Sequence, residues 1–394
     1  MNILFISWDS DQTNYLENLF FPIFQGLQQT TTWQFHVMQF SWAAATEVDR
    51  IRLLAEASGI RYTQVPVSRR PTPTVGSLRT LSTGSRKIKD YLASHNIDCL
   101  MPRSTLPAWM VLRLTHWLQA RALPVVFDAD GFPIQERIDF AGLKSGSLHC
   151  RWLKQVESRM VRQANRVLTR SEKAIAIHLQ RSGEGQGGKF YRVCNGRNPA
   201  VFRPNPAIRN VIRQELGISD STRLWLYSGS IGPQYLVPEM LQLFWSCYQE
   251  NPLHRFLFLV RNRESLRTSI PEHLKQLVLI ETVPFSRVPD YYAAADLGIS
   301  LRKQAPSLAG LAPIKIGEYL LSGLPVLLSE GIGDLSDLLA REKACFVYRN
   351  NTTGFQTWLD QTKTLSTKDI RAVGERYFGL QQSLEDYMHA LQHC

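Results

Sequence analysis

The 394-residue sequence lacks the patterns that mark several common classes of protein. Its six cysteines include no CxxC pair, and no set of histidines and cysteines has the spacing of a zinc site, so we expect reduced thiols and no zinc module. No window holds the roughly 18 uninterrupted apolar residues of a membrane span. A P-loop and a GxSxG motif are also missing, which removes the usual signatures of P-loop nucleotide hydrolysis and of serine hydrolases.

The first residues, MNILFISWDSD, do not have the composition of a signal peptide. No basic stretch precedes the apolar run, and the run turns acidic after seven residues. We therefore interpret residues 2–7 as a buried strand. Together with the scattered cysteines, this start favours a cytoplasmic protein.

Positive charge is concentrated in the first half of the chain. Residues 1–200 contain 25 Lys and Arg against 15 Asp and Glu, a net charge of +10, whereas residues 201–394 contain 20 against 19, a net charge of +1. The excess is either a solvated surface or a surface attracted to an anionic partner, such as lipid head groups at the inner face of a membrane. Basic and aromatic residues are not interleaved as in single-strand-binding proteins, so no nucleic-acid partner is expected.

The segment 16–27, LENLFFPIFQGL, has two interpretations. Its aromatic and aliphatic side chains could contact lipid beside the basic surface. Alternatively, it forms a core helix that is kinked at Pro22.

Short apolar runs alternate with helix-sized segments, which predicts parallel sheets covered on both faces. A stretch with three prolines, 196–210, divides the alternation in two and is the best candidate linker. We therefore predict two doubly wound α/β domains with a cleft between them, with ligands beyond the carboxyl ends of the strands. The expected strands are 2–7, 36–41, 98–104, 124–129 and 166–171 in the first half, and 223–230, 255–262, 277–283, 297–302, 325–329 and 345–348 in the second.

The stretch LAPIKIGEYLL places a cation, Lys315, in the first turn of an expected helix that begins at Pro313. A cation there opposes the helix dipole unless an anion lies nearby. The small residues of 302–313 and of SGSIG (228–232) would expose backbone amides to such an anion. Glu318 shares a helix face with Lys315, so a simple salt bridge between the two is the alternative interpretation.

Two DxD triplets follow apolar strands, Asp9–Asp11 and Asp128–Asp130. Paired carboxylates can hold Mg²⁺ or Mn²⁺ on a diphosphate. Because chance triplets are expected among 34 acidic residues, the metal interpretation stays an alternative.

Four segments within residues 190–340 resemble the retaining nucleotide-sugar glycosyltransferases of family 4, which have the GT-B fold. The first is NGRNPAVFRP (195–204), similar to the domain-hinge signature of that family. The others are YSGSIGPQYL (227–236), VPFSRVPDYYAAADLGISLR (283–302) and APIKIGEYLLSGLPVLLSEGIGD (312–334), and they occur in the family's order. TRSEKA (169–174) fits as well, whereas the rest of the first half matches only in its strand rhythm.

The resemblance implies a GT-B protein with two Rossmann-like domains facing across a cleft. It implies an acceptor-side domain over 1–200, a donor domain over 201–378 and a C-terminal helix, 379–394, packed back on the first domain. Glu318 would bind the donor ribose, Val283 and Pro284 would contact the base, and Lys315 would face the diphosphate and assist catalysis. The other expected donor contacts are Gly229, Ser230, Arg261, Arg302, Lys303, Ser307, Leu308, Ala309, Gly310 and Leu311.

The sequence departs from the family at two places. Gly310 stands where the family often has a second glutamate, and SGSIGPQYL lacks the usual arginine and lysine. On the acceptor side, the segment Asp128–Asp130 replaces a strand-end histidine, and either carboxylate could orient or deprotonate a hydroxyl.

The implied activity is transfer of a sugar from a nucleotide diphosphate to a glycan or lipid-linked acceptor, with retention, in surface polysaccharide or glycoconjugate biosynthesis. No cofactor and no essential metal are expected. The alternatives are a catalytically silent GT-B binding protein, a metal-dependent GT-A transferase using Asp128 and Asp130, and a GT-B-like nucleotide-sugar epimerase.

Overall fold

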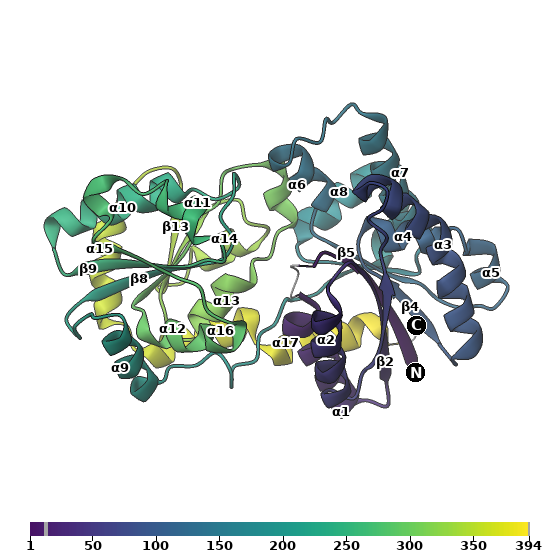
Figure 1. The fold of residues 1–394 in the computed structure, drawn as a ribbon, viewed down its shortest axis with the longest axis horizontal. Helices are drawn as coiled ribbons and strands as arrows, with labels where there is room; N and C mark the ends of the chain where they lie inside the picture. The colour runs from purple at the N-terminus through teal and green to yellow at the C-terminus, as the bar shows by residue number, and fades with distance from the viewer. Residues whose placement is uncertain (12–14, 393–394) are drawn as a thin grey trace. The chain divides into compact units, whose positions relative to one another are not determined.

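A computed structural model describes residues 1–11 and 15–392 of the chain (Figure 1). The chain forms two compact units. The first contains residues 1–194, 309–311 and those from Ser383 onward, and the second contains 195–308 and 312–382. Both units are α/β with parallel strands, as the sequence predicts.

The first unit is built on strands in the order β3-β2-β1-β4 and β5-β6-β7. Single bridges, Leu100 to Val125 and Arg103 to Asp128, join β4 to β5. The order reverses between β1 and β4, which is where ligands bind in open α/β sheets. The strands are β1 Asn2–Asp9, β2 Gln34–Ser41, β3 Arg61–Pro66, β4 Cys99–Pro102, β5 Val126–Asp130, β6 Arg166–Thr169 and β7 Phe190–Arg192.

The second unit has one six-stranded parallel sheet in the order β10-β9-β8-β11-β12-β13. Its order reverses between β8 and β11, so this sheet has the same kind of switch point as the first. The strands are β8 Arg223–Ser228, β9 His254–Leu259, β10 Val278–Glu281, β11 Leu297–Ser300, β12 Val326–Ser329 and β13 Cys345–Tyr348.

Helices connect the strands in both units. In the first unit they are η1 Leu16–Phe20, α1 Phe21–Thr30, α2 Ala45–Ala57, α3 Pro73–Ser94, α4 Thr105–Leu112, α5 Thr115–Gln119, α6 Pro133–Phe140, α7 Leu148–Gln163, α8 Glu172–Ser182 and η2 Glu184–Lys189. In the second they are α9 Pro206–Glu215, α10 Val237–Glu250, α11 Arg263–Arg267, η3 Glu272–Leu274, η4 Phe285–Arg287, α12 Val288–Ala294, α13 Ile314–Leu321, α14 Leu335–Leu339, α15 Phe355–Gln361, η6 Thr362–Thr364 and α16 Thr367–Phe378. The turn η5 Pro306–Gly310 and the helix α17 Leu380–Leu391 each contain residues of both units.

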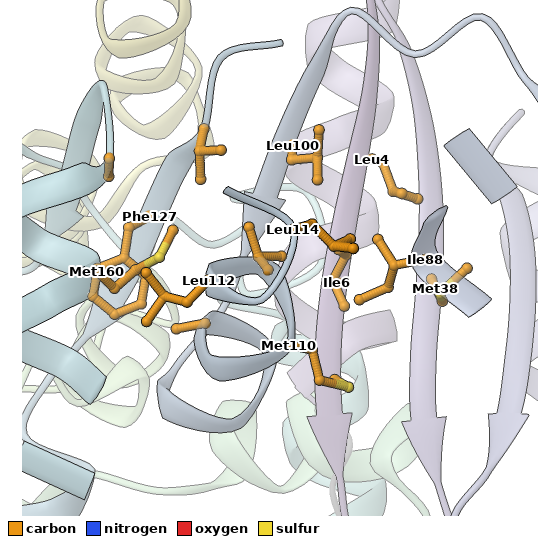
Figure 2. Packing of buried hydrophobic residues seen from close by; sticks show 14 of the residues in the cluster. Leu4, Ile6, Met38, Ile88, Leu100, Met110, Leu112, Leu114, Phe127 and Met160 are labelled. Atoms are coloured by element: carbon orange, nitrogen blue, oxygen red, sulfur yellow. The ribbon is translucent and has the colours of Figure 1, made fainter. Parts of the chain in front are cut away.

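Alternating side chains of the first sheet form two cores. On one face, Leu4 and Ile6 pack with Met38 and with Ile88 of α3, as Figure 2 shows. On the other face, the ring of Phe5 lies 4.7 Å from that of Phe20 and 5.2 Å from that of Phe24.

The segment 16–27 belongs to this second core, so the proposed lipid contact of these residues is wrong. Its aliphatic and aromatic side chains are buried, and Pro22 lies at the start of α1, where η1 gives way to the α-helix. The core-helix alternative is therefore correct. In the described part of the chain, no helix is both long and apolar enough to cross a membrane.

All eleven expected strands are present, and the described residues form two more that the sequence missed. The missed strand β3 has half-exposed polar residues at most positions, because it lies at the edge of its sheet. The missed strand β7 has only three residues and is also an edge strand. Neither has the continuous apolar run that identifies a central parallel strand.

Candidate functional site

The carboxyl edge of the second sheet gathers half of the expected donor contacts. Strands β10, β9, β8 and β11 are neighbours and parallel, so the residues that follow them lie along one edge. The residues that follow these four strands, in the same order, are Val283 and Pro284, Arg261, Gly229 and Ser230, and Arg302 and Lys303.

The turn after β8 needs its glycine. Gly229 has a φ of 155°, a backbone conformation that other residues rarely adopt, and its amide donates to the carbonyl of Leu259 at 3.1 Å. Ser230 is exposed, and its carbonyl accepts a 2.6 Å bond from the hydroxyl of Tyr227. Bonds to Leu259 and Tyr227 therefore fix the backbone of the turn, while Ser230 stays accessible to solvent.

The end of β11 places two cations beside this turn. The guanidinium of Arg302 lies 4.8 Å from the centre of the Tyr235 ring and donates to the Tyr235 hydroxyl at 3.3 Å. The Arg302 amide donates to the hydroxyl of Ser329 at 2.7 Å. Lys303 is exposed. Since Tyr235 comes from the loop after β8, aromatic packing fixes the arginine at the switch point.

Glu318 on α13 is fully buried and has three partners within the second unit. Its Oε2 accepts 3.0 Å bonds from the Tyr292 hydroxyl and from Lys315 Nζ, and its Oε1 lies 2.7 Å from Arg197 Nη2. Burial alone raises the pKa of this carboxyl, but the charges of Lys315 and Arg197 outweigh it and hold the pKa below its ordinary value. Glu318 is therefore an ionised anchor.

The salt bridge between Lys315 and Glu318, the alternative left open by the sequence, is present. The lysine side chain is about one quarter exposed, whereas the glutamate is inaccessible. A ribose could reach the carboxylate only if Lys315 moved aside. Ribose binding by Glu318 and diphosphate binding by Lys315 therefore remain predictions.

The expected loop 307–312 is divided between the units. Ser307 and Leu308 are buried in the second, whereas Ala309, Gly310 and Leu311 group with the first. A Cβ at Gly310 would lie 2.7 Å from a ring carbon of Phe132, closer than real contacts. Gly310, where the family that the sequence resembles often has a glutamate, is therefore a position with no room for a side chain.

Asp128 and Asp130, at the end of β5, meet two arginines from neighbouring strand ends. Arg170 Nη2 lies 2.9 Å and 3.0 Å from the two Asp128 oxygens. Arg103 donates to Asp128 at 3.0 Å and to Asp130 at 2.7 Å. The buried, unpartnered hydroxyl of Tyr387 on α17 lies in the electrostatic range of this cluster.

The two expected catalytic carboxylates differ in their accessibility within this cluster. Burial raises the pKa of Asp128, but Arg170 and Arg103 reverse the effect and hold it below its ordinary value. Asp128 is completely buried, whereas the side chain of Asp130 is one third exposed and its φ is 60°. Asp130 can therefore reach a ligand, and Asp128 can act on it only by positioning Arg103 and Arg170.

The structure offers no preformed metal site at the DxD triplets among the described residues. Among the described residues, no group of three or more His, Cys, Asp or Glu side chains could hold a metal ion. Asp9 accepts bonds from Ser7 at 2.7 Å and from Gln39 at 2.9 Å, and Asp128 is occupied by arginines.

Sequence reasoning missed the partners that hold these carboxylates. Arg197 lies in the hinge-like segment and Arg170 in TRSEKA, so both were within segments already singled out, although no role was assigned to them. Tyr292 also lies in a segment singled out, 283–302, without an assigned role. Arg103 and Tyr387 had no such signal, because only the folded chain brings them to Asp128.

No protein-family model matches this chain, and no curated protein matches it in sequence. Solved structures do match over its whole length. HepE of Anabaena, in complex with UDP and glucose, superposes with a TM-score of 0.74 at 15% identity, covering 100% of both chains. The fold is GT-B. The catalytic domain of starch synthase IV from Arabidopsis thaliana, bound to ADP and acarbose, gives 0.69 at 13% identity, covering 99% of this chain and 98% of that one.

The same fold also supports a different reaction. UDP-GlcNAc 2-epimerase from Neisseria meningitidis, bound to UDP-GlcNAc, matches with a TM-score of 0.62 at 13% identity, covering 99% of each chain. At these identities the likeness establishes the fold and leaves the activity to the site. The two-unit fold does exclude the single-domain GT-A alternative.

Proposed function

We propose that this protein is a retaining, family 4-like glycosyltransferase that uses a nucleotide-diphosphate sugar. The observation that carries the proposal is the carboxyl edge of the second sheet, where Gly229 and Arg302 follow the two switch-point strands, β8 and β11. The helix α13 of the same unit carries Lys315 and the buried Glu318. The similar structures named above were solved with UDP and glucose, with ADP and acarbose, and with UDP-GlcNAc, which supports a nucleotide ligand for this chain.

Departure of the diphosphate is the step that these residues would assist. Negative charge grows on the diphosphate as the bond to the sugar breaks, so fixed cations and helix amides at that place lower the barrier. Lys315, Arg302 and Arg261 are the proposed cations, and the N-terminus of α13 adds its dipole. With these charges, an essential metal is not expected.

On the acceptor side, Asp130 is the proposed group that orients or deprotonates the attacking hydroxyl. Its carboxylate accepts a 2.7 Å bond from Arg103, which directs it, while one third of the side chain stays exposed. The proposed acceptor is a glycan or a lipid-linked sugar in surface polysaccharide or glycoconjugate biosynthesis. Activity that is lost in EDTA and restored by Mn²⁺ would contradict the metal-independent mechanism.

A thermal-shift panel of UDP-, ADP-, GDP- and dTDP-sugars tests the donor. A ligand at 100 times its Kd adds about 2.7 kcal/mol to the free energy of unfolding, so one nucleotide should stand out. Release of nucleoside diphosphate without acceptor then tests cleavage of the donor, with water receiving the sugar, and NMR of the anomeric proton of that sugar, recorded before it mutarotates, tests retention.

Other outcomes would assign the alternatives. Binding without any release would indicate a silent binding protein, which Gly310 and the inaccessible Glu318 would explain. Conversion of UDP-GlcNAc at its sugar C2 would indicate an epimerase. No stabilisation by any nucleotide sugar would contradict the proposal.

We also propose that the protein works at the inner face of a membrane, held peripherally by α3 of the first unit. The inner side of this helix is buried through Leu81, Ile88 and Leu92. Its outer side exposes Val75 and Leu78 near the start. Four exposed cations follow them, Arg79, Arg86, Lys87 and Lys89. A basic face with a few apolar side chains is typical of helices that lie on anionic lipid.

A further inference from the structure

A small hollow in the first unit lies between α4 and α7. It has a volume of about 170 Å³. Its walls are the indoles of Trp109 and Trp152, and Gln155 lies on its rim with two arginines. The lining residues are Trp109, Leu112, Arg113, Trp152, Gln155, Val156 and Arg159.

The two tryptophans form a corner on a rigid floor. Their ring centres are 6.0 Å apart and their planes meet at 63°, and both side chains are half-buried. The floor residue Leu112 belongs to the main core of the unit, where it lies beside Phe127 and Met160 (Figure 2). The corner is therefore preformed, and a ligand would not have to order it.

The charged side chains that line the hollow are two arginines, Arg113 and Arg159. Arg113 and Arg159 are exposed, and no ion pair in the described chain engages either of them. The guanidinium of Arg113 lies 4.8 Å from the centre of the Trp109 ring, which holds it at the rim. Among the residues that the structure describes, no carboxylate lines the hollow. The site therefore favours an anion.

The volume decides what size of group fits. At about 30 Å³ per water molecule, the hollow holds the equivalent of five or six waters. Pockets that enclose a whole nucleotide or drug-sized ligand run from about 300 to 1,000 Å³, so only a single ring fits here. A saccharide ring has an apolar face of C–H groups that packs on an indole, and an edge of hydroxyls that can bond Gln155.

We propose that this hollow is a secondary binding site for one acidic sugar residue of a glycan, separate from the carboxyl edges of both sheets. The carboxylate of the sugar would pair with Arg113 and Arg159, since guanidinium matches carboxylate geometry. A membrane is disfavoured because lipid binding requires protruding apolar side chains, whereas these tryptophans line a depression. The first residue of α4 that lines the hollow, Trp109, lies four residues, about 6 Å, from the start of the helix, which follows β4 at the Asp128 edge.

The experiment measures binding of tetragalacturonate to the full chain by calorimetry. Maltotetraose, inorganic phosphate and phosphatidylglycerol vesicles serve as comparison ligands. The variant Arg113→Gln with Arg159→Gln should bind tetragalacturonate at least about tenfold more weakly. The matched control is Arg121→Gln, because Arg121 also covers a tryptophan, Trp117 at 3.9 Å, outside the hollow. A second variant, Trp152→Phe, replaces the indole that lines the hollow by a smaller ring and keeps the position aromatic.

Support requires binding of the acidic tetramer above that of the neutral one, loss in both hollow variants and no change in the control. Equal loss in Arg121→Gln, equal binding of maltotetraose, or binding of vesicles or phosphate alone would overturn the proposal. Nucleotide release from the donor should be the same in all variants. The two proposals can therefore fail independently.

Discussion

At the scale of the residue, Glu318 is the buried carboxylate that binds Lys315, Arg197 and Tyr292 in the proposed donor site. Glu318→Gln removes a buried charge that Lys315 and Arg197 share, so it should lower stability by about 3–5 kcal/mol as well as weaken donor binding. Because ribose contacts exist equally in substrate and transition state, the kinetic effect should appear mainly in KM. Steady-state kinetics below the melting temperature of the variant measure this effect.

Lys315→Met should behave differently at the same site. Lys315 is proposed to meet charge that grows during bond breaking, so its loss should lower kcat by on the order of 100-fold. Conservative Lys315→Arg should restore part of the rate. If both Lys315→Met and Glu318→Gln keep normal kinetics and only melt earlier, the pair is a structural salt bridge and its assigned roles are wrong.

A second residue-scale prediction concerns Glu157 on α7. Burial raises the pKa of this carboxyl to about 7, although Arg181 and Lys154 lower it. Because the folded pKa lies above the unfolded value, the unfolded state loses its proton first as pH rises. Stability should therefore fall between about pH 4.5 and 7. Glu157→Gln should gain about 2 kcal/mol more over wild type at pH 8 than at pH 5.

Denaturant unfolding of both proteins at the two pH values measures that difference. Comparing variant with wild type cancels the opposite trend from the buried histidines His36, His178 and His254, since burial lowers the pKa of each to about 4. A pH-independent gain would show that Glu157 is already ionised in the folded protein.

The site shows which contacts a sequence can reveal. Lys315 and Glu318 are three residues apart on one helix, so local geometry alone predicts that they meet. Arg197 and Tyr292 reach the same carboxylate from 121 and 26 residues away, and only tertiary folding sets that meeting. The same holds for Asp128. The sequence allowed its carboxylate to contact an acceptor, but in the folded chain Arg170 binds that carboxylate.

At the scale of the element, α3 is the candidate membrane-facing helix. Replacing Arg86 and Lys87 by glutamate reverses two exposed charges without touching the buried face. With about 1 kcal/mol per basic residue near an anionic surface, vesicle binding should weaken by tenfold or more. The matched control is Arg341→Glu with Lys343→Glu, an equal charge change on the second unit.

Co-sedimentation with phosphatidylglycerol and phosphatidylcholine vesicles, at low and high salt, measures this binding. Equal pelleting with neutral and anionic vesicles, or equal weakening by the control, would contradict a role for α3.

Helices and strands can be predicted from the sequence where burial of apolar side chains alone determines the pattern. Central strands such as β1 and β8 read as apolar runs because both faces are covered. Edge strands such as β3 lack that signal, since one side meets solvent. The segment 16–27 shows the converse case, in which an apolar run fits lipid and core equally well until its partners, Phe5 and Phe35, are known.

At the scale of the whole molecule, the end of the chain should matter to the stability of its beginning. From Ser383 onward, α17 belongs to the first unit, where Leu384, Tyr387 and Leu391 are buried. Truncation after Gln382 should cost about 5 kcal/mol or more, at 1.5–3 kcal/mol per buried side chain. Limited proteolysis should then cut within residues 1–194 first. Truncation after Gln392 is the control, and early cuts in 195–382 instead would contradict the prediction.

This return of α17 also affects the order in which the protein can mature during translation. The hydroxyl of Ser383 donates to the carbonyl of Cys194, and the carboxylate of Asp386 accepts from its amide. The ribosome must add 188 residues between Cys194 and Ser383, which takes about 10–40 s at 5–20 residues per second. During that time the nascent first unit lacks a helix that covers apolar surface, so it is the part of the chain that a chaperone would be expected to engage.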